Sequence, residues 1–136
     1  EKNKLKSYLF LIIIVFGTLS FAKKNTMQCQ GAKLRIINKI TTEQITYDIP
    51  LSQTLELDNA KVKILKCLIV EDSGVQDQIA LLSHKISDQK NKNFLGWIFK
   101  SSQYVNSPVN PIFDIKLEKC LLEDPIFLKK QSTKIF

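Results

Sequence analysis

The stretch IFDIKLEKC at residues 112–120 decides the fold class. Its odd-numbered positions begin with Phe113, Ile115 and Leu117, whereas positions 114, 116 and 118 are charged. Successive side chains of a β-strand point to opposite faces of the sheet, so this alternation predicts a strand with one buried face and one wet face. Wet faces are common in antiparallel sheets, and we expect such a sheet here.

Short runs of β-branched and aromatic residues recur upstream of this strand. They predict further strands at 33–40, 44–49, 54–57, 61–70, 78–87 and 94–100. Turn residues separate the runs, and Pro108 and Pro111 exclude residues 106–111 from the interior of a central strand. No segment of this region has a convincing helical stripe. The pattern predicts an all-β fold: a single small antiparallel β-sandwich or barrel-like domain.

The N-terminal residues have the layout of a secretory signal peptide. Three lysines precede an unbroken apolar run at residues 8–16, and small residues follow up to Ala22. We expect residues 1–22 to be a signal peptide that is cleaved after Ala22, which places the chain in the periplasm or cell envelope. The alternatives are an uncleaved membrane anchor, which would be the chain's only membrane contact, and an ordinary helix. Residues 23–32 are then a flexible leader, 33–120 the β domain and 121–136 a C-terminal extension, frayed at 129–134 and with a possible short helix start at 124–125.

The chain is basic, with a formal net charge of +7, but its charge pattern excludes a nucleic-acid partner. Arg35 is its only arginine, and the lysines are spread along the sequence. Nucleic-acid recognition favours the arginine fork and a basic stripe. Diffuse lysines are typical of a solvated surface.

No catalytic, metal or cofactor site can be assembled from the sequence. His84 is the only histidine, so a Ser-His, Cys-His or zinc site would depend on it. Lys100 and Ser101 are adjacent on a predicted strand and would point to opposite faces. No G-x-G spacing is present to cradle a phosphate. We therefore expect a noncatalytic protein without cofactor or metal.

Three cysteines remain after the predicted cleavage site. Cys67 and Cys120 each lie in a predicted strand, whereas Cys29 lies in the leader. Disulfides persist outside the cytoplasm, and we expect a bridge between Cys67 and Cys120. Cys29 is then either a spare thiol or a link to a second chain.

The segment FLGWIFKSS at residues 94–102 contains the only tryptophan, Trp97, next to Gly96. Paired hydroxyl groups follow it, and then the run NPIFD at residues 110–114. One interpretation is a core strand in which Gly96 permits a bulge or the close approach of another backbone and Trp97 fills the core. The other is a ligand or partner groove centred on Trp97.

This segment resembles the end of DUF2155, a family of uncharacterised exported alphaproteobacterial proteins. The resemblance covers roughly residues 32–120, and Cys67 matches the other cysteine of the family. It is most specific at Phe94, Gly96, Trp97, Ile98, Phe99, Ser101, Ser102, Pro111, Ile112, Phe113, Asp114 and Cys120. Asn110 stands where the family usually has histidine, and we interpret this position as structural, with a turn hydrogen bond before Pro111. The resemblance implies an envelope compartment and a disulfide but no reaction.

These observations favour a noncatalytic, exported cell-envelope domain that binds a protein or an envelope polymer. The first alternative is a small-ligand carrier or sensor with its pocket near Trp97. A periplasmic hydrolase is a weaker alternative, because the site chemistry is sparse.

Overall fold

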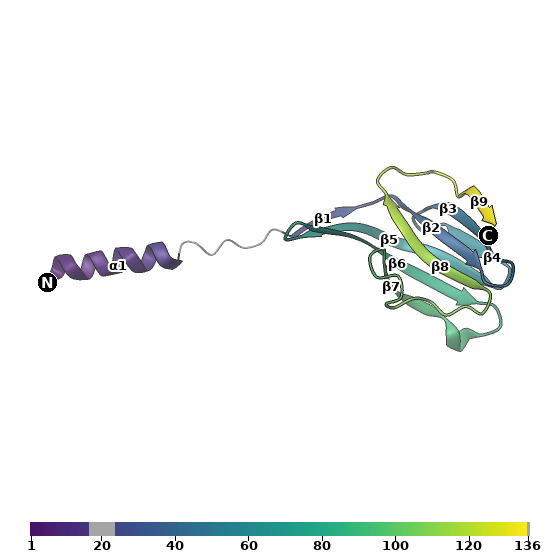
Figure 1. The fold of residues 1–136 in the computed structure, drawn as a ribbon, viewed down its shortest axis with the longest axis horizontal. Helices are drawn as coiled ribbons and strands as arrows, with labels where there is room; N and C mark the ends of the chain where they lie inside the picture. The colour runs from purple at the N-terminus through teal and green to yellow at the C-terminus, as the bar shows by residue number, and fades with distance from the viewer. Residues whose placement is uncertain (17–23, 136) are drawn as a thin grey trace.

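The protein forms two antiparallel sheets in a computed structural model that describes residues 1–16 and 24–135 (Figure 1). One helix precedes the sheets, and a single 3-10 turn, η1 (Lys90–Lys92), lies between two strands. The elements are α1 (Lys2–Phe16), β1 (Lys24–Gln28), β2 (Gly31–Asn38), β3 (Glu43–Pro50), β4 (Thr54–Leu57), β5 (Ala60–Asp72), β6 (Val75–Ile86), β7 (Phe94–Phe99), β8 (Phe113–Leu121) and β9 (Lys129–Ile135).

The two sheets pack face to face as a β-sandwich (Figure 1). The first, which we call the β5–β6 sheet, has the order β1-β5-β6-β7, with β4 also paired to β5. The second, the β2–β3 sheet, has the order β8-β2-β3-β9. The predicted all-β antiparallel fold is confirmed, and each of the seven predicted strands is present within a few residues of its expected bounds.

The core lies between the sheets and follows the alternation of the sequence. On β8, Phe113, Ile115 and Leu117 are buried, as the opening stretch predicts. On β5 and β6, every second residue contributes in the same way, among them Val62, Ile64, Ala80 and Leu82. Burial of such apolar side chains is the main stabilising term for a domain of this size.

The disulfide between Cys67 and Cys120 is confirmed, with an S–S distance of 2.06 Å. Cys67 lies on β5 and Cys120 on β8, so the bridge joins the two sheets. The covalent link holds the β5–β6 sheet in a fixed position against its partner.

The expectation of a flexible leader at residues 23–32 is wrong where the structure describes it. Residues 24–28 form β1, which pairs antiparallel with residues 68–72 of β5, and β2 begins at Gly31. Cys29 is buried in the core. All five side chains of β1 are exposed, so the strand is held by backbone hydrogen bonds and leaves no alternation in the sequence.

The frayed tail expected at 129–134 is also wrong. Residues 129–135 form β9, which pairs with β3 at the edge of the β2–β3 sheet. No helix starts at residues 124–125; instead the Asp124 carboxylate accepts a hydrogen bond from the Ile126 backbone N–H at 2.8 Å, and the chain turns toward β9.

The N-terminal helix α1 spans 15 residues. Within the ranges 1–16 and 24–135, no helix is long and apolar enough to cross a bilayer. The predicted cleavage site after Ala22 lies outside the described residues, so the signal peptide stays a prediction.

Candidate functional site

The sequence motif at residues 94–99 forms β7, the edge strand of the β5–β6 sheet. Gly96 pairs with Leu82 and Ile98 with Ala80, and these partners are buried, so even-numbered residues of β7 face the core. Trp97 pairs with Leu81 on the opposite face and is only half-buried. The interpretation that Trp97 fills the core is therefore wrong, and Ile98, which is 4% exposed, takes that place.

Gly96 permits the close approach of side chains rather than of another backbone. A Cβ atom at this position would lie 2.8 Å from Cζ of Phe94 and 3.0 Å from Nδ2 of Asn106. The Asn106 amide donates a hydrogen bond to the Trp97 carbonyl at 2.9 Å. The absence of a side chain at Gly96 therefore leaves room for Asn106, in the loop after β7, to form a hydrogen bond with the strand that contains Trp97.

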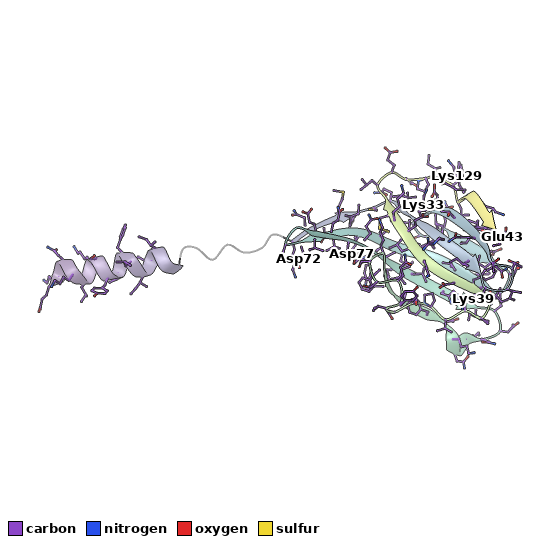
Figure 2. All side chains as sticks on the ribbon, viewed as in Figure 1. Lys33, Lys39, Glu43, Asp72, Asp77 and Lys129 are labelled. Atoms are coloured by element: carbon purple, nitrogen blue, oxygen red, sulfur yellow. A yellow bond between two sulfur atoms is a disulfide. The ribbon has the colours of Figure 1, made fainter. Side chains whose placement is uncertain are left out.

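The paired hydroxyl residues have different surroundings. The Ser101 hydroxyl donates to Oδ2 of Asp77 on β6 at 2.6 Å, and its backbone N–H donates to Oδ1 at 3.2 Å (Asp77 is labelled in Figure 2). Ser102 is exposed, and its carbonyl accepts a hydrogen bond from the Val105 N–H at 3.1 Å. Both residues thus help to close the turn at the end of β7.

Asn110 is almost completely buried, at 1% exposure, and organises the turn into β8. Its side-chain oxygen accepts hydrogen bonds from the backbone N–H groups of Ile112 at 2.9 Å and Phe113 at 3.0 Å. The backbone carbonyl of Asn110 accepts a hydrogen bond from Nζ of Lys39 at 2.8 Å (Lys39 is labelled in Figure 2). These bonds include the turn hydrogen bonds that the sequence interpretation assigns to this position, across Pro111, which is itself exposed.

Asn110 also contacts two polar side chains at the same end of the sandwich. Its Nδ2 lies 3.2 Å from Oδ1 of Asn59 and 3.1 Å from Nε2 of His84. An amide nitrogen only donates, so Nε2 of His84 accepts and the proton of the neutral ring lies on Nδ1. Burial lowers the pKa of His84 from its ordinary value of 6.5. The cluster of Asn59, His84 and Asn110 therefore holds a neutral, buried imidazole.

The remaining motif residues serve the sandwich. Phe113 is part of the core, and Asp114 forms an ion pair with Lys116 two residues further along the same face of β8, at 3.5 Å. Phe94 and Phe99 are half-buried at opposite ends of β7. The structure thus distributes the motif between the core, the turn at Asn110 and the outer surface, and does not gather it into one cavity.

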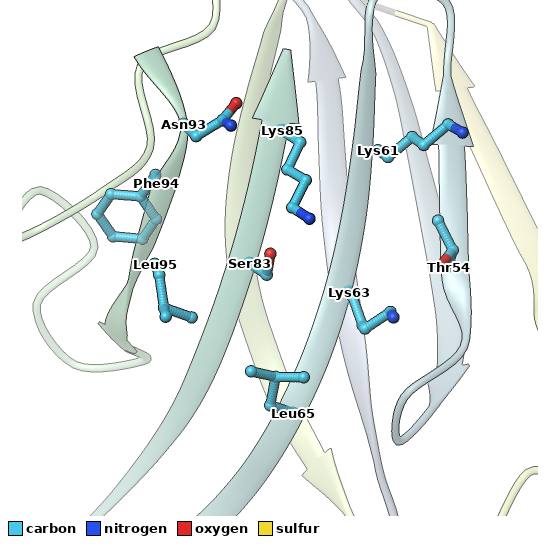
Figure 3. Close-up of a pocket in the computed structure, with 9 residues that line it drawn as sticks. All are labelled: Thr54, Lys61, Lys63, Leu65, Ser83, Lys85, Asn93, Phe94 and Leu95. Carbon is cyan, nitrogen blue, oxygen red and sulfur yellow. The ribbon is translucent and has the colours of Figure 1, made fainter. Parts of the chain in front are cut away.

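The outer face of the β5–β6 sheet carries a surface that the sequence analysis missed. By outer face we mean the side chains of β4, β5, β6 and β7 that point away from the β2–β3 sheet. A groove of about 560 Å³ lies on it (Figure 3). The groove is lined by Thr54, Lys61, Lys63, Leu65, Ser83, Lys85, Asn93, Phe94 and Leu95.

Strand register arranges the outer face in rows with different chemistry. One row pairs Lys61 with Lys85, and the next contains Lys63, Ser83 and Leu95. The following rows are mainly apolar: Leu81 pairs with Trp97 on β7 and with the exposed Lys66 on β5, and Leu68 pairs with Ile79, which pairs with Phe99. The basic end and the apolar end therefore lie at different levels along the same strands.

The lysines of the groove are largely uncompensated. Nζ of Lys61 lies 3.8 Å from Oε1 of Glu56, and both side chains are exposed. Within the described part of the chain, no carboxylate lies at ion-pair distance from Lys63 or Lys85. Two of the three ammonium groups are thus free to bind an anion.

Cys29 is the remaining thiol, and it is packed beside the disulfide. Its backbone N–H donates to the carbonyl of Cys67 at 2.8 Å, and its side chain is 2% exposed. Burial raises the pKa of the Cys29 thiol, which keeps it protonated and poorly reactive. Among the described residues, no group of three or more His, Cys, Asp or Glu side chains is placed to hold a metal ion.

Comparison with known proteins gives a family without an assigned activity. Residues 32–120 match the family described as "Uncharacterized protein conserved in bacteria (DUF2155)". An uncharacterized protein of Rickettsia prowazekii (strain Madrid E) is 28% identical over 93 residues, which cover 66% of this chain and 60% of that protein. The chain thus matches less than two thirds of that relative's length. No solved structure matches the chain.

The family match begins in β2 and ends at Cys120 in β8. It includes both disulfide cysteines, the strand with Gly96 and Trp97, and the outer-face groove, whereas β1 and β9 lie outside it. Because the match covers more than half of the sequence, this chain belongs to the DUF2155 family of uncharacterized bacterial proteins.

Proposed function

We propose that this chain is an exported, noncatalytic domain of the cell envelope that binds a protein or an envelope polymer through the outer face of the β5–β6 sheet. The observation that carries the proposal is the composition of that face. A water-facing sheet surface is normally polar, but this one combines uncompensated lysines with rows of apolar side chains. Contiguous exposed apolar surface rimmed by polar groups is typical of an interaction site.

The geometry of the candidate nucleophiles and bases supports a noncatalytic role. His84, the only histidine, is fully buried within the cluster with Asn59 and Asn110. The Ser101 hydroxyl is held by the Asp77 carboxylate in a turn. A general base must reach the proton that it abstracts, and neither group borders the outer-face groove.

Two features support export. The N-terminal segment combines lysines, an apolar run and small residues in the order of a signal peptide. The disulfide between Cys67 and Cys120 suits an oxidising compartment, since such bridges are rare in the cytosol.

A second candidate function, a small-ligand carrier or sensor, is favoured by the groove itself. Its volume of about 560 Å³ is in the range of small-molecule sites, about 300–1,000 Å³. The groove lies at the lysine end of the outer face, around Leu65 and Leu95, rather than around Trp97.

Site-specific photocrosslinking in the native host tests the proposed surface. A photoreactive residue in place of Leu95, which is 66% exposed on the outer face, should yield discrete adducts. The matched control is the same residue in place of Leu122, which is 55% exposed and lies beyond β8. Identical adduct patterns at the two positions would refute the outer face as the binding surface.

The mass of the protein recovered from the envelope tests export independently. A mass that begins at Lys23, with the bridge between Cys67 and Cys120 intact, is expected. Recovery of a full-length, fully reduced chain from the cytosol would contradict the envelope role.

A further inference from the structure

We propose that the outer-face groove binds one molecule of an anionic amphiphile, with its head at the lysines and its acyl chain along the apolar rows toward Trp97 and Phe99. The ligand class is a molecule with a phosphate or carboxylate head and a hydrocarbon tail, either a free lipid or the lipid end of an envelope polymer. This inference rests on the proposed function, because it uses the same face as the binding surface.

The basic end of the groove supplies the site for the anionic head. Lys61 and Lys85 are direct cross-strand partners, and Lys63 lies one row away, so three lysines line the same end of the groove; Lys85 extends toward Ser83, whereas Lys61 extends toward β4 (Figure 3). Like charges directly opposite each other on a sheet are destabilising. An anion between them would remove that repulsion, and the Ser83 hydroxyl beside Lys63 offers a further hydrogen-bond donor.

The apolar rows supply the site for the tail. Leu65 and Leu95 border the lysines in the groove, and the register continues through Leu81 with Trp97 and then Ile79 with Phe99. Neighbouring rows on one face are two residues apart, about 6.6 Å, so the face extends about 20 Å from the first lysine row to the Phe99 row. That length suits an extended hydrocarbon chain that lies parallel to the strands.

The shape of the face favours a single molecule over a bilayer. Trp97, Phe99 and Leu81 are half-buried among their neighbours instead of protruding. A bilayer needs side chains that reach into the acyl region, whereas a lone chain that leaves the groove can lie along these rows and cover them. The groove lysines lie at one end of the apolar rows of β6 and β7, which Lys66 of β5 flanks, and this arrangement also orients one head and one tail.

Trp97 provides a direct readout, because it is the only tryptophan in the chain. The probe is monomeric lysophosphatidylglycerol, added below its micelle concentration to the full chain. We expect a saturable blue shift of the Trp97 emission as the tail covers the indole. Zwitterionic lysophosphatidylcholine should bind at least about tenfold more weakly, and inorganic phosphate alone should leave the emission unchanged.

The lysines are tested by a charge-removal variant with a matched control. Lys63→Ala combined with Lys85→Ala should weaken lysophosphatidylglycerol binding about tenfold or more without lowering the thermal midpoint, because neither ammonium has a carboxylate partner within the described chain. Lys119→Ala removes an exposed lysine of β8, on the other sheet, and should leave binding unchanged.

Three results would overturn the inference. The first is absence of a monomer-induced shift, and the second is equal affinity of the double-lysine variant and the Lys119→Ala control. The third is binding to phosphatidylglycerol vesicles alone, which would assign the face to a membrane surface. If amphiphile binding fails while the Leu95 photocrosslinker captures a discrete protein, this inference falls and the proposed function stands; if both fail, both fall.

Discussion

The two faces of the β5–β6 sheet have the same backbone and opposite chemistry. The inner face contains Val62, Ile64, Ala80 and Leu82, and its one imidazole, His84, is hydrogen-bonded and neutral. The outer face alternates with it residue by residue and contains lysines without carboxylate partners next to half-buried apolar side chains. The inner face buries its groups and leaves Nδ1 of His84 without a hydrogen-bond partner in the described chain, whereas the outer face leaves lysines without carboxylate partners beside apolar side chains.

This contrast assigns stability and ligand binding to different residues of the same strands. Substitutions on the inner face should change the free energy of unfolding, because they leave cavities or unpaired polar groups. Substitutions on the outer face should change the affinity for a ligand and leave stability almost unchanged.

The largest effect is expected from removal of the bridge that holds the inner faces together. Replacing both Cys67 and Cys120 with alanine should lower the free energy of unfolding by about 4 kcal/mol, given a sequence separation of 53 residues. Urea denaturation of the variant and of the parent measures the difference. Reducing agent should destabilise the parent and have no effect on the variant; equal sensitivity of the two proteins would contradict the assignment of the bridge.

The next largest effect is expected at Asn110. Asn110→Ala removes the acceptor for two backbone N–H groups, those of Ile112 and Phe113, and should cost about 3 kcal/mol of unfolding free energy. Asn106→Ala is the matched control, because its single exposed bond to the Trp97 carbonyl should cost less than about 1 kcal/mol. Thermal or urea unfolding measures both variants. Equal losses of unfolding free energy in the two would show that Asn110 is no more than a surface turn residue.

The fold was predictable where one face of a strand is buried. Residues 113–117 alternate because β8 packs Phe113, Ile115 and Leu117 on the core, and runs of β-branched and aromatic residues bounded by turn residues located the other six predicted strands. The bridge was predictable because both cysteines lie in such strands. Strands β1 and β9 were missed: β1 exposes all its side chains, and both lie at sheet edges, where backbone pairing leaves no pattern in the sequence.

The candidate site was less predictable, because it depends on register. All residues of β7 other than Gly96 are apolar, so nothing in the sequence indicated that Ile98 faces the core and Trp97 faces out. Lys61 and Lys85 are far apart in sequence and meet only through the pairing of β5 with β6, which includes a register shift between Ile64 and Lys66. Evenly spread lysines therefore indicated a solvated surface, whereas the fold places three of them along one groove.

Acid should lower the free energy of unfolding, because His84 is buried in its neutral form on the inner face. Burial lowers the pKa of this imidazole in the folded chain, so its neutral form stabilises the fold above the ordinary value of 6.5, and that stability is lost as the pH falls below it. The loss is measured by urea denaturation between pH 7.5 and 5, and one titrating group limits its slope to at most about 1.4 kcal/mol per pH unit. His84→Gln should flatten the profile in this range; an unchanged profile in the variant would assign the acid sensitivity to other groups.

The smallest effect on stability is expected on the outer face. Leu95→Ser shortens a side chain that is 66% exposed and should change the free energy of unfolding by no more than about 0.5 kcal/mol. Ile98, three residues away on the same strand, is 4% exposed, and Ile98→Ala should cost about 2–5 kcal/mol through the cavity that it leaves. The same two variants should invert their order in ligand binding, since Leu95 lines the groove and Ile98 faces the core. Comparable losses of stability at the two positions would mean that the outer face is packed like a core, and the separation of stability from binding on this sheet would fail.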